Sequence, residues 1–212
     1  ALLTNLEKRD HAEPVIKSIA LKTLSKKSRV NFSAETQTYN ARGANGNYRI
    51  PSPIPVNNSF GVEIRTYDVV NGLYNKYGPY KIRMFFNDSL TFHIQCDTLT
   101  FKKTHLINFD RNGQLMNAGK GRYIRLWRFL RDTQLPFYKG QYSGIHNLPP
   151  GTHNIRIVVE DFNGNSSTIN FTVASTKQNL PKIKEYKLDQ DSLNIAISRD
   201  SVHNFYKRIE AE

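Results

Sequence analysis

The sequence predicts an all-β protein, an antiparallel β-sandwich with long loops. Apolar and polar residues alternate in short runs along much of the chain, as they do in half-buried strands. The stretches between these runs are rich in Asn, Asp, Gly and Pro, which favour turns. Few segments show the 3.6-residue spacing of apolar residues that is typical of an amphipathic helix.

The alternating runs predict strands near residues 15–24, 60–68, 81–87, 90–96, 155–159 and 169–173. Turn-forming residues at 161–165 separate the last two runs, so we expect a hairpin there. We expect a flexible loop at 41–47 and a further strand at 193–198. Residues 114–131 fit either a helix or a strand.

Changes in composition divide the chain into three parts. Residues 1–12 are expected to be a linker from an upstream region, because the chain opens without a signal peptide. Residues 13–176 form the predicted sandwich domain. Residues 177–212 are charged and are expected to be a linker followed by the start of a further β module, or an extension that packs back on the sandwich.

The net charge indicates the kind of partner. Lys and Arg number 30 against 18 Asp and Glu, a formal charge of +12, which favours contact with anionic polymers. No RNA-binding motif or zinc finger is present, so no nucleic acid is expected. No apolar run approaches the roughly 20 residues of a membrane helix, so no transmembrane segment is expected.

The most suggestive surface feature lies at residues 120–131, where cations alternate with aromatic residues. Such a stretch can hold an anionic or sugar-rich polymer by charge and by stacking. The commoner arrangement is that Ile124, Leu126 and Trp127 belong to the core while the arginines extend outward over it. The predicted binding residues are Lys120, Arg122, Tyr123, Arg125, Arg128 and Arg131.

None of the common catalytic constellations is present. His93 and Asp97 have a spacing used in some zinc sites, but along a strand they lie about 13 Å apart, too far to share one ion. Cys96 points away from His93, which excludes a Cys–His nucleophile pair. Residues 161–165 offer alternating oxygen ligands, as calcium loops do, yet the same residues make an ordinary turn. We therefore expect no catalytic residue, no metal ligand and no cofactor in this chain.

Several motifs together resemble the β-rich region that follows the catalytic domain in lysostaphin-type peptidoglycan metallopeptidases of Gram-negative bacteria. The resemblance covers roughly residues 13 to 175 and is strongest from residue 57. It rests on Pro14 to Lys17, Tyr67-Asp68 with Asn71-Gly72, Asn75, Gly78 to Tyr80 with Ile82, Asp97, Phe101, Ile107-Asn108, and Val159 to Asp161 with Gly164 to Ser167.

The resemblance implies an immunoglobulin-like sandwich in a periplasmic or other cell-envelope protein that is exported. The zinc ligands of that family lie in a separate upstream domain, and nothing here matches them, so zinc is expected only in such a domain. We therefore expect a non-catalytic accessory module, whose partners are its own upstream peptidase domain and peptidoglycan or another anionic envelope polymer. The alternatives are a free-standing glycan- or surface-binding protein and an enzyme of unknown type.

Overall fold

The predicted alternating runs form the long strands of the protein. In the second sheet the long strands bury alternate side chains, as in β12, where the odd-numbered residues from His153 to Val159 are buried. The computed structural model describes residues 10–71, 74–98, 110–128, 135, 137–139, 142 and 144–175, and the backbone of 183–189 and 192–197. The long strands are β1 (Val15–Thr23), β7 (Phe60–Val69), β9 (Lys81–Phe86), β10 (Ser89–Gln95), β12 (Gly151–Glu160) and β13 (Ser166–Ser175).

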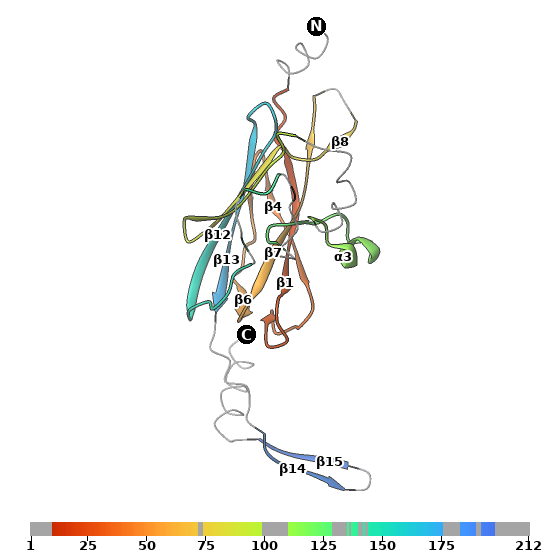
Figure 1. Ribbon diagram of the computed structural model, residues 1–212, viewed down its shortest axis with the longest axis vertical. Helices are drawn as coiled ribbons and strands as arrows, with labels where there is room; N and C mark the ends of the chain where they lie inside the picture. Colours follow the sequence, from red (N-terminus) through yellow and green to blue (C-terminus); the bar gives the residue numbers. More distant parts are fainter. Residues whose placement is uncertain are drawn as a thin grey trace. The chain divides into compact units, whose positions relative to one another are not determined.

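The chain divides into two compact units, Ala1–Thr176 and Lys177–Glu212. In the second unit, β14 (Ile183–Asp189) and β15 (Ser192–Ile197) pair antiparallel as one hairpin. The first unit is a β-sandwich, which confirms the predicted fold class (Figure 1). No helix among the described residues is long and apolar enough to cross a membrane.

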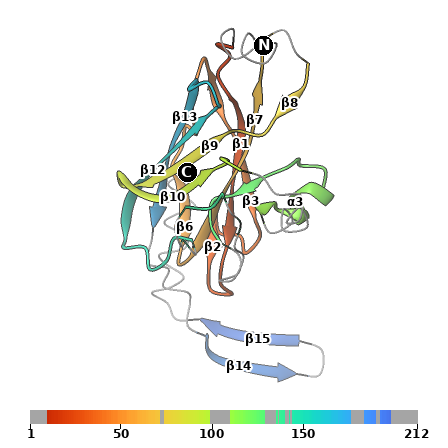
Figure 2. The ribbon, with the colours of Figure 1, turned by 45° about the horizontal axis from the view of Figure 1, so that its top comes forward.

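Two sheets make up the sandwich. The first has the strand order β11 (Ile124–Arg125), β7, β1, β3 (Gln37–Asn40), and β8 (Lys76–Tyr77) pairs with the far end of β7. The second has the order β10, β9, β12, β13, β5 (Asn47–Arg49), β4 (Arg42–Ala44), and Figure 2 shows β9 and β10 beside β12. In addition, β6 (Ile54–Asn57) pairs with β13 and with β2 (Arg29–Val30).

Two features of the second sheet differ from the sequence prediction. Residues 41–47 were expected to be a flexible loop, but they belong to the β4–β5 hairpin, which turns at Asn45 and Gly46 with positive φ. The sheet was expected to be antiparallel, but β13 pairs in parallel with both β5 and β6. Parallel partners are distant in sequence, so local alternation does not reveal them.

The apolar core fills the space between the two sheets. Ile19 and Leu21 of β1 and Val62 and Ile64 of β7 face Ile157 and the other inward side chains of the second sheet. The inner faces of both sheets are therefore buried, as in other sandwiches.

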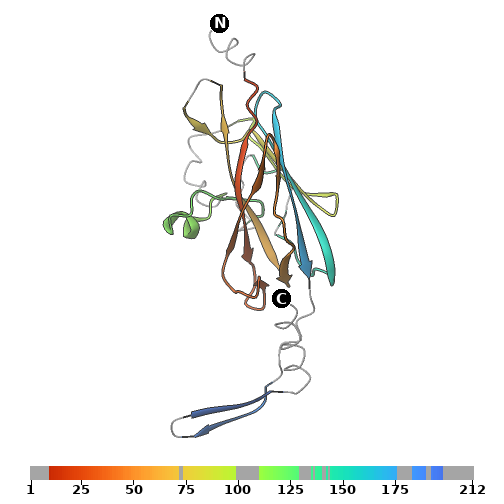
Figure 3. The ribbon, with the colours of Figure 1, turned by 180° about the vertical axis from the view of Figure 1, so that it is seen from behind.

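Residues 110–128 cover part of the outer face of the first sheet. They contain α3 (Gly113–Asn117), and Figures 1 and 3 show α3 on the side of β1 and β7 away from β12 and β13. Leu115 and Tyr123 pack on Ala20 of β1 in a small separate cluster. The Asn112 side chain caps α3 by accepting the Leu115 N–H at 3.1 Å.

Candidate functional site

Two of the predicted binding residues belong to this covering segment and are buried between it and the first sheet. The Tyr123 side chain is 2% exposed, and its hydroxyl lies 2.7 Å from Ser18 Oγ on β1. Arg125 is 8% exposed, and its Nε lies 3.7 Å from Glu63 Oε1 on β7. The alternative in which the arginines extend outward is therefore wrong for Arg125, because this guanidinium turns inward to a buried carboxylate.

Glu63 is the centre of a buried polar network. Its carboxylate accepts a 2.6 Å hydrogen bond from Asn112 Nδ2, and its side chain is fully buried. Burial raises the pKa of Glu63, while the Asn112 hydrogen bond and the Arg125 charge oppose that rise. The network therefore fastens residues 110–128 to the first sheet.

The other predicted binding residues do not form one patch. Lys120 and Arg122 are exposed, whereas Arg128 is half-buried, with its guanidinium 5.7 Å from the centre of the Tyr138 ring. Arg131 lies outside the described residues.

Arg122 lies instead on a groove between the covering segment and the β7–β8 hairpin. The groove has a volume of about 570 Å³. One wall comes from β7 and β8, and the other from residues of the segment that follows Asp110. The lining consists of Arg65, Thr66, Tyr67, Lys76, Tyr77, Gly78, Pro79, Arg111, Met116, Gly121, Arg122 and Ile124.

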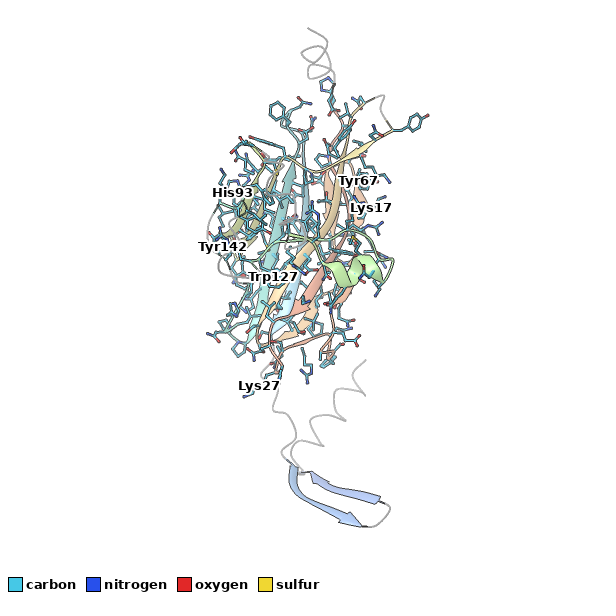
Figure 4. All side chains as sticks on the ribbon, turned by 45° about the vertical axis from the view of Figure 1, so that its right-hand side comes forward. Lys17, Lys27, Tyr67, His93, Trp127 and Tyr142 are labelled. Atoms are coloured by element: carbon cyan, nitrogen blue, oxygen red, sulfur yellow. The ribbon has the colours of Figure 1, made fainter. Side chains whose placement is uncertain are left out.

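The basic side chains of the groove are held by few internal contacts. Arg65 Nη1 donates a 3.1 Å hydrogen bond to the Lys120 carbonyl. The ammonium group of Lys76 lies 4.7 Å from the centre of the Tyr67 ring, and that of Lys17 lies 5.8 Å from it. Figure 4 shows Lys17 and Tyr67 on the same side of the sandwich.

Positive charge in the groove is largely uncompensated. Its described lining includes four basic side chains and no acidic one. Of these four basic residues, Arg111 forms an ion pair with the buried Asp110, and the other three have none in the described part of the chain. A groove of this kind attracts anions and excludes cations.

A second polar cluster lies where the residues before β1 meet the β12–β13 turn. Asp10, Asp68 and Asp161 are all buried, and each has a carboxylate oxygen within 4.8 Å of the other two. Among the described residues, no Lys, Arg or His forms an ion pair with any of them. Carboxylate oxygens suit calcium. Among the described residues, these three aspartates are the group whose geometry could hold a cation.

Hydrogen bonds from amides already engage most of this cluster. Asn165 donates from its backbone N–H and its side chain to Asp161, both at 2.7 Å. Asp10 Oδ1 accepts the N–H of Asn71 at 3.3 Å. Burial and the neighbouring charge of Asp161 raise the pKa of Asp68 to about 6.

Two of the residues considered for zinc or nucleophilic chemistry, Asp97 and Cys96, lie in surroundings that do not favour it. Asp97 accepts hydrogen bonds from Tyr80, Gln95 and Lys139, and the Gln95 hydrogen bond is foremost in lowering its pKa to about 2. Burial raises the pKa of the Cys96 thiol, which leaves it a weaker nucleophile.

Sequence reasoning found Arg122 but missed the rest of the groove. Arg65 and Tyr67 lie on the outer face of β7, which the two-residue period of that strand could have shown. Their meeting with Arg111 and Arg122 depends on how the covering segment folds back, and no local signal gives that. The sequence analysis considered the turn at Asp161 as a calcium loop. It missed Asp10 and Asp68, because only the sheet topology brings these distant residues next to Asp161.

Comparisons of the chain with protein-family models, with curated proteins and with solved structures found no match.

Proposed function

We propose that this chain is a non-catalytic binding module of the bacterial cell envelope, exported to the periplasm or the envelope surface. In this proposal it holds a peptidoglycan metallopeptidase-like domain close to its anionic polymer substrate. The resemblance of residues 13 to 175 to the region that follows such peptidase domains supports the peptidase partner.

The observation that carries the binding role is the groove, whose described lining includes Arg65, Lys76, Arg111 and Arg122 and no acidic side chain. Its walls belong to one structural unit, and the Glu63 network fixes the wall that follows Asp110. A preformed basic groove binds an anionic chain with a smaller ordering cost than a mobile surface does.

Co-sedimentation of the full chain with insoluble peptidoglycan tests the proposal. The double variant K76E/R122E reverses two exposed charges of the groove, and we expect it to lower the bound fraction about tenfold. The matched control is K27E/R42E, which makes the same change of charge at two exposed positions outside the groove lining. Figure 4 shows Lys27 at the end of the sandwich far from Tyr67.

If K76E/R122E binds as well as the unmodified chain does, the groove is refuted as the binding site. Equal losses in both would show attraction by net charge alone. Thermal unfolding of each variant confirms that a loss of binding is not a loss of fold.

A free-standing glycan- or surface-binding protein is the second candidate, because every residue of the groove comes from this chain. The sequence of the native protein upstream of residue 1 distinguishes the two. An upstream domain with zinc ligands supports the peptidase module, and its absence supports the free-standing protein.

A further inference from the structure

We propose that the groove recognises carboxylate groups on a peptide, and thus the acidic peptide portion of its polymer, in preference to the sugar strand. This inference rests on the binding role proposed above and adds the chemical class of the ligand.

The kind of cation in the groove is the first step. Three of its four basic residues are arginines: Arg65, Arg111 and Arg122. A guanidinium offers a planar fork that matches the two oxygens of a carboxylate, whereas an ammonium group acts as a point charge. Arginines on both walls suit a chain that carries carboxylates on more than one side.

The groove offers little flat surface for sugar rings. A sugar-binding site stacks rings on open aromatic faces, but Lys17 and Lys76 already lie over the Tyr67 ring. The other aromatic side chain of the lining, Tyr77, is 41% exposed and stands across from Met116, which is 46% exposed. A tyrosine and a flexible thioether suit short aliphatic side chains better than a stack of sugar rings.

Two of the three arginines, Arg65 and Arg122, have no acidic partner among the described residues. Asp110 is buried and lies outside the groove lining, where it pairs with Arg111 and accepts a 3.0 Å hydrogen bond from the Tyr138 hydroxyl. Arg122 is exposed and has no ion pair among the described residues. Incoming carboxylates therefore meet cations whose charge is available.

Fluorescence anisotropy with a labelled Gly-Glu-Ala-Glu-Ala-Glu peptide tests the inference on the full chain. The control probe has glutamine in place of each glutamate and an amidated C-terminus. We expect the acidic peptide to bind at least about tenfold more tightly than the control, because a carboxylate can form a bidentate ion pair with arginine and a neutral amide cannot. K76E/R122E should weaken this binding about tenfold, and K27E/R42E by less than about twofold.

The variant K76Q/R122Q removes the same two charges without reversing them, and it should also weaken binding. It controls for misfolding caused by the reversed charges.

Two competitors complete the test. An uncharged oligomer of N-acetylglucosamine should not displace the acidic peptide, and its displacement of the peptide would overturn the inference in favour of sugar recognition. If polyphosphate binds and the acidic peptide does not, the inference is overturned, and the groove recognises phosphate groups instead of carboxylates.

The result also separates this inference from the proposed function. If K76E/R122E abolishes co-sedimentation with peptidoglycan but neither peptide binds, the binding role stands and carboxylate recognition fails. If the chain does not co-sediment and does not bind the acidic peptide, both fail.

Discussion

Gly61 of β7 lies directly against the indole of Trp127, so that a Cβ added at Gly61 would come within 2.5 Å of Trp127 Nε1. Trp127 is buried, and it stands one residue after Leu126, whose N–H donates to the Val62 carbonyl at 2.9 Å. The absence of a side chain at residue 61 is what lets the covering segment approach the sheet.

The variant G61A should therefore lower the free energy of unfolding by about 1–3 kcal/mol, because the added methyl group must push back a well-packed ring. Urea unfolding of the full chain measures this. The control is G113A at the start of α3, where an added Cβ meets no atom within 4 Å, so no loss is expected. An equal loss in the two variants would contradict the close approach.

Tyr123, which is buried, and Tyr39, which is half-buried, should respond differently to loss of the hydroxyl. Y123F removes the 2.7 Å hydrogen bond to Ser18 and should cost about 1 kcal/mol. The Tyr39 hydroxyl is buried with no hydrogen-bond partner in the described part of the chain, and burial raises the pKa of Tyr39 to about 12. Y39F should therefore leave the free energy of unfolding unchanged or raise it, and a loss as large as that of Y123F would show that Tyr39 has a partner in solution.

The contact between Asn112 and Glu63 can be tested without removing the cap of α3. Asp is a good N-cap, so N112D keeps the bond to the Leu115 N–H but loses the donor to Glu63 and adds a like charge. We expect a loss of about 2 kcal/mol at pH 7. The loss should shrink in the E63Q background, where residue 63 can donate, and a double-mutant cycle measures the coupling. A coupling of zero would contradict the network.

Asp68 predicts a pH dependence of stability. Its pKa is about 6 in the folded chain against an ordinary value of 3.8, so the folded state holds its proton more tightly than the unfolded state. The contribution of Asp68 to stability therefore falls as the pH rises from about 4 to about 6, and is then constant.

D68N keeps the shape of the side chain without the charge, so it should raise the melting temperature at pH 7. The difference between D68N and the unmodified chain should vanish near pH 4. A D68N variant that melts below the unmodified chain at pH 7 would show that the charge of Asp68 is compensated in solution.

Gly121 controls the position of Arg65 in the groove. Its φ is +101°, and an added Cβ would come within 2.6 Å of Arg65 Nε. G121A should displace this guanidinium and weaken co-sedimentation with peptidoglycan. The control is G119A, which also has positive φ, at +70°, but has no atom within 4 Å of the added Cβ. Both variants carry backbone strain, so only a difference in binding between them supports the role of Arg65.

The sequence predicted the long strands well because alternation of apolar residues is a local property. The hairpin at 161–165 was also predicted correctly, since β12 and β13 pair antiparallel across it. The short strands β4 and β5 were missed, because Gly43 and its neighbours have no apolar pattern; β4 pairs with β5, and β5 pairs with the distant β13.

The candidate site was less accessible to sequence reasoning. Arg122 and Arg125 look similar in the sequence, since both are arginines next to aromatic or aliphatic residues of the same stretch. The structure separates them because Glu63, some 60 residues earlier in the chain, draws Arg125 inward. The orientation of each arginine depends on a partner that only the tertiary fold supplies.

The parallel pairing of β13 with β5 and β6 has a consequence for the kinetics of folding. These partners lie about 120 residues before β13, and contacts of such long range slow the search for the native topology. During synthesis, β5 and β6 leave the ribosome well before β13. The apolar side chains of Ile54 and Val56 therefore stay without their partner strand until β13 has been made. Closure of the second sheet is therefore expected to be a late step, and the nascent chain is most prone to aggregate in the interval before it.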